Sequence, residues 1–413
     1  MTSSLTVFTD LRAQYSTWPA LRDFLTSDAG GRLRVIEHES ANGSANGSAI
    51  IRYVKGTSDF SKSHVPAFRS VVWNTQTHLP VSVAPLKAQK SDPPAGVPLR
   101  VTDFIDGVMI QAWIPTSPAE AGPQIATRTS IGAAGTFYSQ RCFADLLEDA
   151  LKPMGGTTAF LKTVLHPGQF TSLLLQHPDH KTVAVIQTPR VYATHFGTVN
   201  ADGGVTFAYD PSTWPQRLAA LSPTLYEPSK VFSDPAEAVA LLRQNALGHA
   251  WQGLVFQDMT STKRWRLRNP AYVAVRNLRG AEASQTARFL RLRAEGKMKE
   301  YIGFFREESP MFWSLEQRFR LRTQALYDAY TRLHKAKSSS MRDLPLIFRP
   351  HVYAIHGQYM AKFSVGARPP PVLKETVIAY VNSLPQEDQV RLIESPLFVP
   401  AQRAPSLAQA AVV

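Results

Sequence analysis

The feature that most constrains the fold is a change in the spacing of apolar residues near residue 280. Before it, short runs of β-branched and aromatic residues alternate with turn residues, a pattern typical of β-strands. After it, apolar residues recur every three or four positions, as on one face of a helix. In the segment 309–336 this face comprises Phe312, Leu315, Phe319, Leu326, Tyr330 and Leu333. The change predicts an α+β chain, with a mixed α/β domain followed by an all-helical one.

The segments expected within this frame can be placed along the chain. Seven runs have strand composition: 47–54, 68–74, 79–86, 108–114, 181–188, 252–258 and 271–275. Helices are expected at 139–152, 234–247, 284–296, 297–305, 309–336 and 373–384. Asp234 can cap the second of these, with Pro235 in its first turn. We therefore expect domains at 1–280 and 281–398, and a mobile tail at 399–413.

Composition limits the setting of the protein. The chain has 413 residues, enough for two domains. No apolar run approaches the ~18 residues that cross a bilayer, and the N-terminus lacks the features of a signal peptide. Cys142 is the only cysteine, which excludes an intrachain disulfide. An intracellular, cytoplasmic protein is expected, or a virion component if the protein is viral.

The charge favours polyanionic partners. Net charge is +13 and the isoelectric point is about 9.8. Residues 1–280 carry 26 basic and 20 acidic residues, and residues 281–413 carry 19 and 12, so the density of positive charge rises toward the C-terminus. Nucleic acid is the first expected partner, and an anionic membrane or other acidic surface the second.

Common catalytic motifs are absent from the sequence. There is no G-x-x-x-x-G-K-[ST] phosphate loop and no H-E-x-x-H zinc motif. The two histidines of "HPDH" at 177–180 are read as part of a Pro-Asp turn between strands. One cysteine cannot build a structural zinc site of cysteines, and no metal site is expected.

Six segments carry basic or turn residues in a suggestive order. "FRSVVWNTQTHLPVSVAPLKAQK" supplies Arg69, Pro85, Lys87 and Lys90, and "FIDG" follows with Phe104, Asp106 and Gly107. "IATRTSIG" contains Arg128, "TSLLLQHPDHKTV" contains Leu174, Pro178 and Lys181, and "WQGLVFQD" contains Gln252. "RWRLRNPAYV" supplies Arg264, Arg266, Arg268 and Tyr272.

In this order the segments resemble the nucleotidyltransferase core of phage-type ATP-dependent RNA ligases and their divergent relatives in large DNA viruses. The resemblance covers about residues 60–280. It implies a ligase-like domain with antiparallel sheets, and the C-terminal part matches only in type, as several such ligases end in a helical domain that helps bind RNA. RNA is accordingly a more expected partner than DNA.

Three departures from the family pattern bear on catalysis. The family's nucleophilic lysine attacks the α-phosphate of ATP, but this chain has Phe104 there, which offers no lone pair. Two family glutamates, which contact ribose or metal, are replaced by Leu174 and Gln252. The resemblance therefore implies no catalytic residue. ATP and Mg²⁺ would bind only if the site is retained.

The residues expected to hold phosphate are retained. Alternation along a strand places Arg264, Arg266 and Arg268 on one face, with Trp265 and Leu267 on the other. The expected nucleotide- or phosphate-binding set is Arg69, Lys87, Asp106, Gly107, Arg128, Arg266 and Arg268. Simpler readings stay open, in which the arginines are a solvated strand face, Asp106–Gly107 is an ordinary turn and the lysines are incidental. Under every reading Phe104 is expected to be a core residue.

The leading hypothesis is a catalytically degenerate ligase-like protein that binds nucleic acid or a nucleotide through a basic cleft. The first alternative is an active ligase or nucleotidyltransferase, with Lys87 or Lys90 as a displaced nucleophile, or a ligase of pre-adenylated ends. The second alternative is a structural virion or assembly component that reuses the fold.

Overall fold

The computed structural model describes residues 2–38, 47–116, 122–137, 140–223, 234–244, 248–282, 284–363 and 370–398. The chain divides into two compact units, Met1–Asn277 and Leu278–Val413. The division lies three residues before the expected domain boundary at 280. The segment 399–413, which we expected to be a mobile tail, lies outside the described residues.

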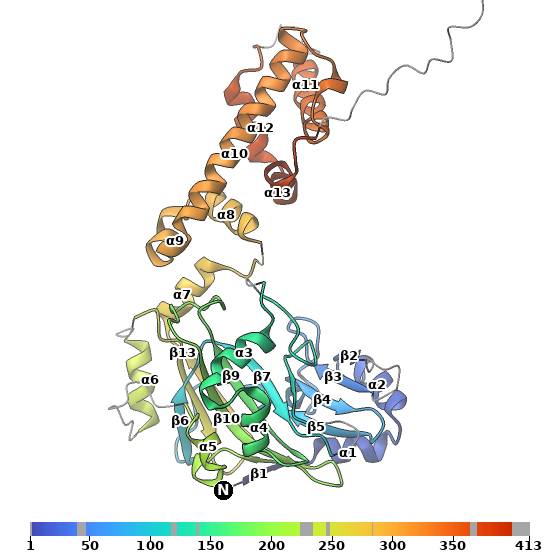
Figure 1. Cartoon of the computed structure of the whole chain (residues 1–413), viewed down its shortest axis with the longest axis vertical. Coiled ribbons are helices and arrows are strands. Elements are labelled where there is room, and N and C mark those ends of the chain that lie inside the picture. The colour runs from blue at the N-terminus through green and yellow to red at the C-terminus, as the bar shows by residue number, and fades with distance from the viewer. Residues whose placement is uncertain are drawn as a thin grey trace, which may run out of the picture. The chain divides into compact units, whose positions relative to one another are not determined.

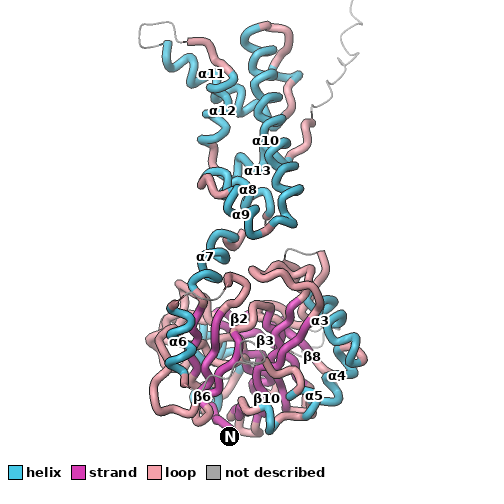
Figure 2. Tube along the Cα trace, turned by 90° about the vertical axis from the view of Figure 1, so that its left-hand side faces the viewer, coloured by secondary structure: helices cyan, strands magenta, loops and turns pink. Residues whose placement is uncertain are grey.

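The first unit is a mixed α/β domain that contains three antiparallel sheets (Figures 1 and 2). The six-stranded sheet comprises, in spatial order, β1 (Thr2–Leu5), β11 (Val205–Ala208), β10 (Arg190–Val199), β9 (Gln169–Gln176), β7 (Val108–Trp113) and β8 (Gln124–Ala126). The four-stranded sheet comprises β2 (Arg34–His38), β3 (Ser48–Arg52), β4 (Val71–Asn74) and β5 (Leu79–Val83). The three-stranded sheet comprises β13 (Arg264–Arg268), β12 (Gly253–Asp258) and β6 (Leu99–Asp103).

Helices cover each sheet of this unit on one side (Figure 1). Three helices pack on the six-stranded sheet through a core that includes Leu147, Phe160 and Leu173: α3 (Phe143–Leu151), α4 (Thr157–Val164) and α5 (Gln216–Ala219). Two helices share a second core with the four-stranded sheet: α1 (Val7–Gln14) and α2 (Trp18–Thr26). Helix α6 (Pro235–Arg243) packs on one face of the three-stranded sheet, which leaves the other face of that sheet for the site described below.

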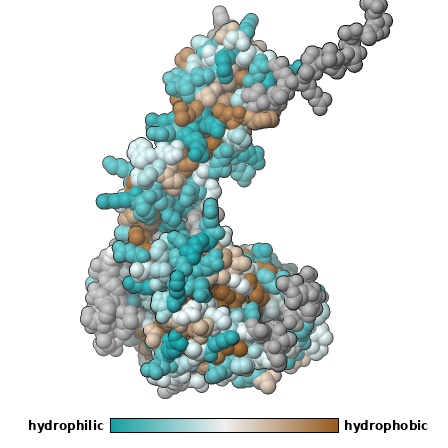
Figure 3. Space-filling model, viewed as in Figure 1, coloured by the Kyte–Doolittle hydropathy of each residue, from teal (hydrophilic) through white to brown (hydrophobic). Residues whose placement is uncertain are grey.

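The second unit is helical. Its helices are α8 (Gln285–Ala294), α9 (Met298–Phe304), α10 (Ser309–Tyr330), α11 (Arg349–Phe363), α12 (Lys374–Ser383) and α13 (Gln386–Glu394). Of the six residues expected to form the apolar face of 309–336, all are buried except Leu333, which is partly exposed. The unit's surface in Figure 3 is mostly hydrophilic with scattered apolar patches. No helix among the described residues is long and apolar enough to span a membrane.

Local sequence accounts for several helix ends. The Asp234 carboxylate accepts a hydrogen bond from the Ala236 N–H at 2.9 Å, so the predicted N-cap of α6 is confirmed. Ser284 caps α8 in the same way through the Ala287 N–H. Gly296, with φ of 69°, lies between α8 and α9, where the sequence predicted a division between two helices.

Two expected strands are wrong. Residues 271–275 belong to helix α7 (Pro270–Arg279), because the Asn269 side chain accepts a hydrogen bond from the Ala271 N–H and Pro270 occupies the first turn. This helix start overrides the β-propensity of the run. Residues 181–188 belong to the loop between β9 and β10, which is held by the hydrogen bond from the Val183 N–H to Asp106.

Candidate anion-binding cleft

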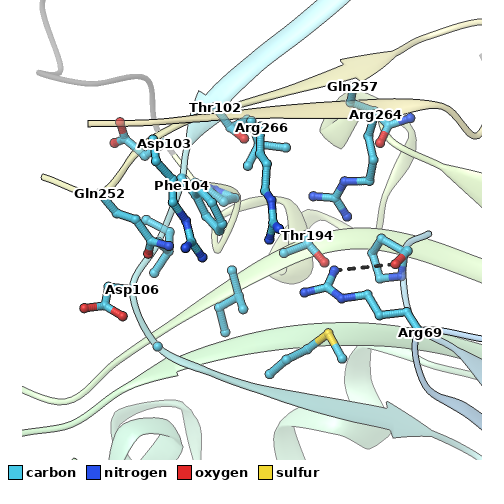
Figure 4. Close-up of a pocket in the computed structure, with 18 of the residues that line it drawn as sticks. Arg69, Thr102, Asp103, Phe104, Asp106, Thr194, Gln252, Gln257, Arg264 and Arg266 are labelled. Atoms are coloured by element: carbon cyan, nitrogen blue, oxygen red, sulfur yellow. Dashed lines mark hydrogen bonds between the residues drawn. The ribbon is translucent and has the colours of Figure 1, made fainter. Parts of the chain in front are cut away.

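A cleft of about 400 Å³ lies in the first unit, between the three-stranded and the six-stranded sheets. Thr102, Val255 and Arg266 line it from β6, β12 and β13, whose register places them directly opposite one another. Met109 and Leu174 line it from the facing strands β7 and β9. Figure 4 shows side chains from both sheets pointing into this space. The lining contains seven arginines and two aspartates, so the cleft is strongly basic.

Strand β13 supplies the guanidinium groups of one wall. Arg264, Arg266 and Arg268 all line the cleft, whereas Trp265 and Leu267 pack on the opposite face against the core under α6. This is the division that strand alternation predicts. Among the described residues, no carboxylate forms a salt bridge with these arginines or with Arg69 and Arg276 of the lining.

Arg69 and Arg264 lie together at one end of the cleft, which we term the inner end (Figure 4). Burial and the positive charge of Arg264 lower the pKa of Arg69 to about 10. Burial also lowers the pKa of Arg264. Tyr209 lines the same end at 2% exposure, and burial raises the pKa of its hydroxyl. Arg69 therefore stays charged at neutral pH, and the inner end brings two guanidinium groups together in a partly enclosed space.

Two further arginines of the lining are held by backbone carbonyls. Arg128 donates from Nε to the Arg69 carbonyl at 3.1 Å and from Nη2 to the Tyr53 carbonyl at 3.2 Å. Arg100 donates to the Tyr209 carbonyl at 2.7 Å. These contacts join separate segments around the inner end, so Arg100 and Arg128 position the wall as well as charging it.

Phe104 follows β6 and is held next to β12, where its N–H donates to the Gly253 carbonyl at 2.8 Å. The expectation that it is a core residue is wrong, because its side chain is partly exposed and lines the cleft. The Arg268 guanidinium lies over its ring, 5.3 Å from the centroid. Leu174 lines the cleft from the facing strand β9, so each wall contributes an apolar side chain.

Asp106 and Gly107 lie at the other end, which we term the outer end (Figure 4). Asp106 Oδ2 accepts a hydrogen bond from the Val183 N–H at 2.9 Å, which ties the loop 177–189 to the cleft. The same carboxylate, together with burial, raises the pKa of Tyr272. A Cβ at Gly107 would lie 2.5 Å from the Leu175 carbonyl oxygen, so only glycine fits there. The pair is therefore a packed junction rather than a free surface turn.

Asp103 lies at the edge of the cleft, where Trp251 Nε1 donates to its Oδ1 at 3.1 Å. Burial raises the pKa of Asp103 to about 6, and the hydrogen bond from Trp251 opposes part of that rise. No arginine contributes to this pKa shift. Asp103 therefore does not neutralise the guanidiniums of the cleft, whereas the charge of Asp106 acts on Arg268.

The residues do not suit a divalent metal. Leu174 has no ligand atom, and Gln252 offers only a neutral carbonyl, whose Oε1 has no hydrogen-bond partner. Across the described ranges, no group of three His, Cys, Asp or Glu side chains is placed to hold a metal ion. Mg²⁺ prefers carboxylate oxygens, whereas the concentrated guanidiniums suit an anion.

The sequence contains seven expected phosphate-binding residues and three departures from the family pattern. Nine of these ten residues line this cleft: Arg69, Phe104, Asp106, Gly107, Arg128, Leu174, Gln252, Arg266 and Arg268.

Lys87, the tenth of these residues, does not line the cleft. Its ammonium lies 3.3 Å from the centroid of the Phe60 ring, and burial and Arg266 lower its pKa. Lys90 is exposed in a second depression beside Arg243, which shares Arg266 and Arg268 with the lining of the cleft. Gln89, between the two lysines, forms backbone hydrogen bonds with Arg264 and Arg266 of β13. This segment therefore runs along the β13 edge of the three-stranded sheet.

Several lining residues were not singled out from the sequence. They are Arg100, Asp103, Thr194, Tyr209 and Arg276. Arg100 had a usable signal, since it alternates with Val101 on a strand that leads into "FIDG". Asp103 had none, because it shares the strand parity of the apolar Val101. Tyr209 and Thr194 had none, because their place in the cleft depends on which strands of the large sheet are neighbours.

Comparisons with known proteins add no relative. No family model matches the sequence, and no curated protein matches it. What the cleft does must therefore be inferred from its own residues.

Proposed function

We propose that the protein binds nucleic acid, RNA in preference to DNA, through this basic cleft, and that its first unit is a degenerate relative of phage-type RNA ligases. The observation that carries the proposal is the convergence of unpaired guanidiniums around Phe104, at the position that would hold the lysine. Guanidiniums grip phosphate oxygens in a bidentate manner, whereas Phe104 cannot form a covalent adenylate.

The arrangement of the resembling segments supports the proposed descent. "FIDG", "WQGLVFQD" and "RWRLR" are far apart in the sequence, yet they lie on or directly follow three neighbouring strands and line one cavity. Had the cleft lacked any of the three, the resemblance would have no structural support. The ligase-like fold remains part of the proposal.

The active-enzyme alternative has less support. No lysine lines the cleft among the described residues, and neither Lys87 nor Lys90 lies in it. A lysine outside the cavity cannot attack a phosphate bound within it. The structural alternative, a virion or assembly component, has no specific observation in its favour.

The binding proposal is tested by titrating the full chain with single-stranded RNA and DNA of one sequence at several salt concentrations. Phosphate contacts release counterions, so affinity should fall on the order of ten- to a hundredfold between about 50 and 200 mM salt. The double variant Arg266→Gln/Arg268→Gln should weaken binding and flatten the salt dependence. The matched control Lys55→Gln/Lys152→Gln removes the same charge from exposed sites outside the cleft. Equal effects of the two variants would contradict a cleft-based site.

Loss of catalysis is tested separately with labelled ATP and Mg²⁺. We expect no label that survives denaturing electrophoresis. A stable covalent label on the wild-type chain would contradict the proposed loss of catalysis and would support the active-ligase alternative.

A further inference from the structure

The inner end of the cleft contains polar atoms that the protein itself does not satisfy. Tyr209, 2% exposed, has a hydroxyl without a hydrogen-bond partner among the described residues, and the same is true of Arg264 Nε. Arg69 has one weak contact, at 3.5 Å, to the Pro85 carbonyl. Unsatisfied buried donors cost free energy, so native proteins seldom retain them without a ligand or water.

The charges at this end are also uncompensated. After burial, the positive charge of Arg264 is the largest cause of the lowered pKa of Arg69, so the two guanidiniums repel each other. His195, directly behind Tyr209 with ring centroids 6.4 Å apart, adds no charge because burial lowers its pKa to about 3. Two like charges that are partly removed from water destabilise the folded chain, and an anion bound between them would offset that cost.

The chemistry of these donors selects among anions. A phosphomonoester carries about −1.5 to −2 charges at pH 7 and three terminal oxygens. An internal phosphodiester has one charge and two free oxygens. A nucleobase offers hydrogen-bond acceptors but no negative charge, so it would leave the charges of both guanidiniums uncompensated. Two guanidinium forks and a hydroxyl therefore match a terminal phosphate better than a mid-chain phosphate or a base.

The rest of the cleft suits what is attached to that phosphate. The lining also contains the apolar side chains of Phe104, Met109 and Leu174. Arg268 covers the Phe104 ring from one side. Aromatic rings of this kind provide stacking surfaces for bases without sequence preference.

We propose that Arg69, Arg264 and Tyr209 form a pocket for a terminal phosphate, so that the cleft takes the phosphorylated end of a nucleic-acid strand rather than its middle. This assignment rests on the proposed function, since it specifies what the same cleft binds. The terminal phosphate belongs to the strand, and a free mononucleotide or inorganic phosphate is the competing source.

The test compares RNAs of one sequence with a 5′-phosphate, a 3′-phosphate or hydroxyls at both ends, bound to the full chain and followed by fluorescence anisotropy. One phosphorylated end should bind on the order of tenfold tighter than the hydroxyl control. Equal affinity for all three would overturn the inference and leave the proposed function standing. Absence of binding to any of the RNAs would defeat the proposed function itself.

Substitutions test which residues produce the preference for a phosphorylated end. Arg264→Gln and Tyr209→Phe should reduce it severalfold, whereas Arg276→Gln, an exposed arginine of the cleft on α7, should weaken all three RNAs alike. Tyr209→Phe removes only a hydroxyl with no partner, so it should fold even if Arg264→Gln does not. A preference unchanged in Tyr209→Phe and Arg264→Gln would overturn the assignment. Displacement of RNA by inorganic phosphate or a mononucleotide at concentrations near those of the competing RNA would also overturn it, in favour of a small-molecule site.

Discussion

Phe104 and Arg268 form a cation–π contact in the lining of the cleft. The guanidinium lies 5.3 Å from the ring centroid, which is within the range of an attractive cation–π interaction. A lysine at the same position would instead place a second positive charge beside Arg268. The residue therefore fits its present surroundings rather than those of a nucleophile.

We expect Phe104→Lys not to form a covalent adenylate with ATP and Mg²⁺. Leu174 and Gln252 supply no carboxylate for the metal, and the new ammonium would be repelled by Arg268. Denaturing electrophoresis after incubation with labelled ATP measures the outcome, with the wild-type chain as control. A label on the variant alone would mean that the nucleophile is the only missing part.

Gly107→Ala should destabilise the first unit by about 1–3 kcal/mol, because its Cβ would lie 2.5 Å from the Leu175 carbonyl oxygen. Gly135→Ala is the matched control, since a Cβ there meets nothing within 4 Å. Urea unfolding followed by circular dichroism measures both. Equal stabilities would show that the strand can move away from Gly107 without cost.

Asp103 should make folding stability depend on pH between about 4 and 6. Its pKa is about 6 when folded and near 3.8 in the absence of shifts. The folded state therefore holds a proton that the unfolded chain has lost, and stability falls as pH rises through this range. Asp103→Asn cannot titrate, so its stability relative to wild type should grow across that window by on the order of 1–3 kcal/mol. Thermal unfolding at several pH values gives the difference, and a constant difference would contradict the raised pKa.

At the scale of elements, the sequence predicted strands well where alternation or β-branched composition was clear. β3, β4, β5, β7 and β12 all lie within expected runs. It failed at 271–275, where Asn269 and Pro270 start a helix despite the β-branched residues that follow. It failed again at 181–188, which form the loop that leads into β10 and is held by the hydrogen bond from the Val183 N–H to Asp106. Capping was visible in the sequence, but sheet order was not, and this is why Tyr209 and Thr194 were missed.

Helices α8, α9 and α10 are joined by a buried polar cluster. Glu308, 4% exposed, accepts hydrogen bonds from Arg288 at 3.3 Å and from the Tyr301 hydroxyl at 2.8 Å. Arg279 lies 3.7 Å from its other oxygen. The cluster consists of charges that are costly to bury singly but acceptable together.

We expect Glu308→Ala to destabilise the helical unit by roughly 3–5 kcal/mol, because the buried Arg288 would lose the carboxylate of Glu308. The exposed pair of Asp388 and Arg391 provides the control, and Asp388→Ala should cost under about 1 kcal/mol. Thermal unfolding of the full chain compares them. A similar small loss for both would mean that water reaches the cluster when Glu308 is removed.

At the scale of the whole molecule, the cleft lies in the first of the two units, and both units carry positive charge. All residues that line the cleft precede Asn277, so the first unit holds the complete site. Both regions of the sequence carry excess positive charge. Charge in the helical unit adds to association with a polyanion without specifying which end is bound.

A chain truncated after Gly280 should keep the preference for phosphorylated ends while its overall affinity falls. The preference depends on the cleft, whereas part of the affinity depends on the charges that are removed. Anisotropy with the phosphorylated and hydroxyl RNAs measures both quantities, after circular dichroism has established that the fragment is folded. A folded fragment that binds RNA without end preference would place discrimination in the helical unit.

The unpaired guanidiniums of the cleft have a practical consequence for preparing the protein. On the proposed function, a cavity with this excess of fixed charge should retain nucleic acid from the cell. Protein purified at low salt should then show excess ultraviolet absorbance of the kind that nucleobases give, and the extracted nucleic acid could be sequenced.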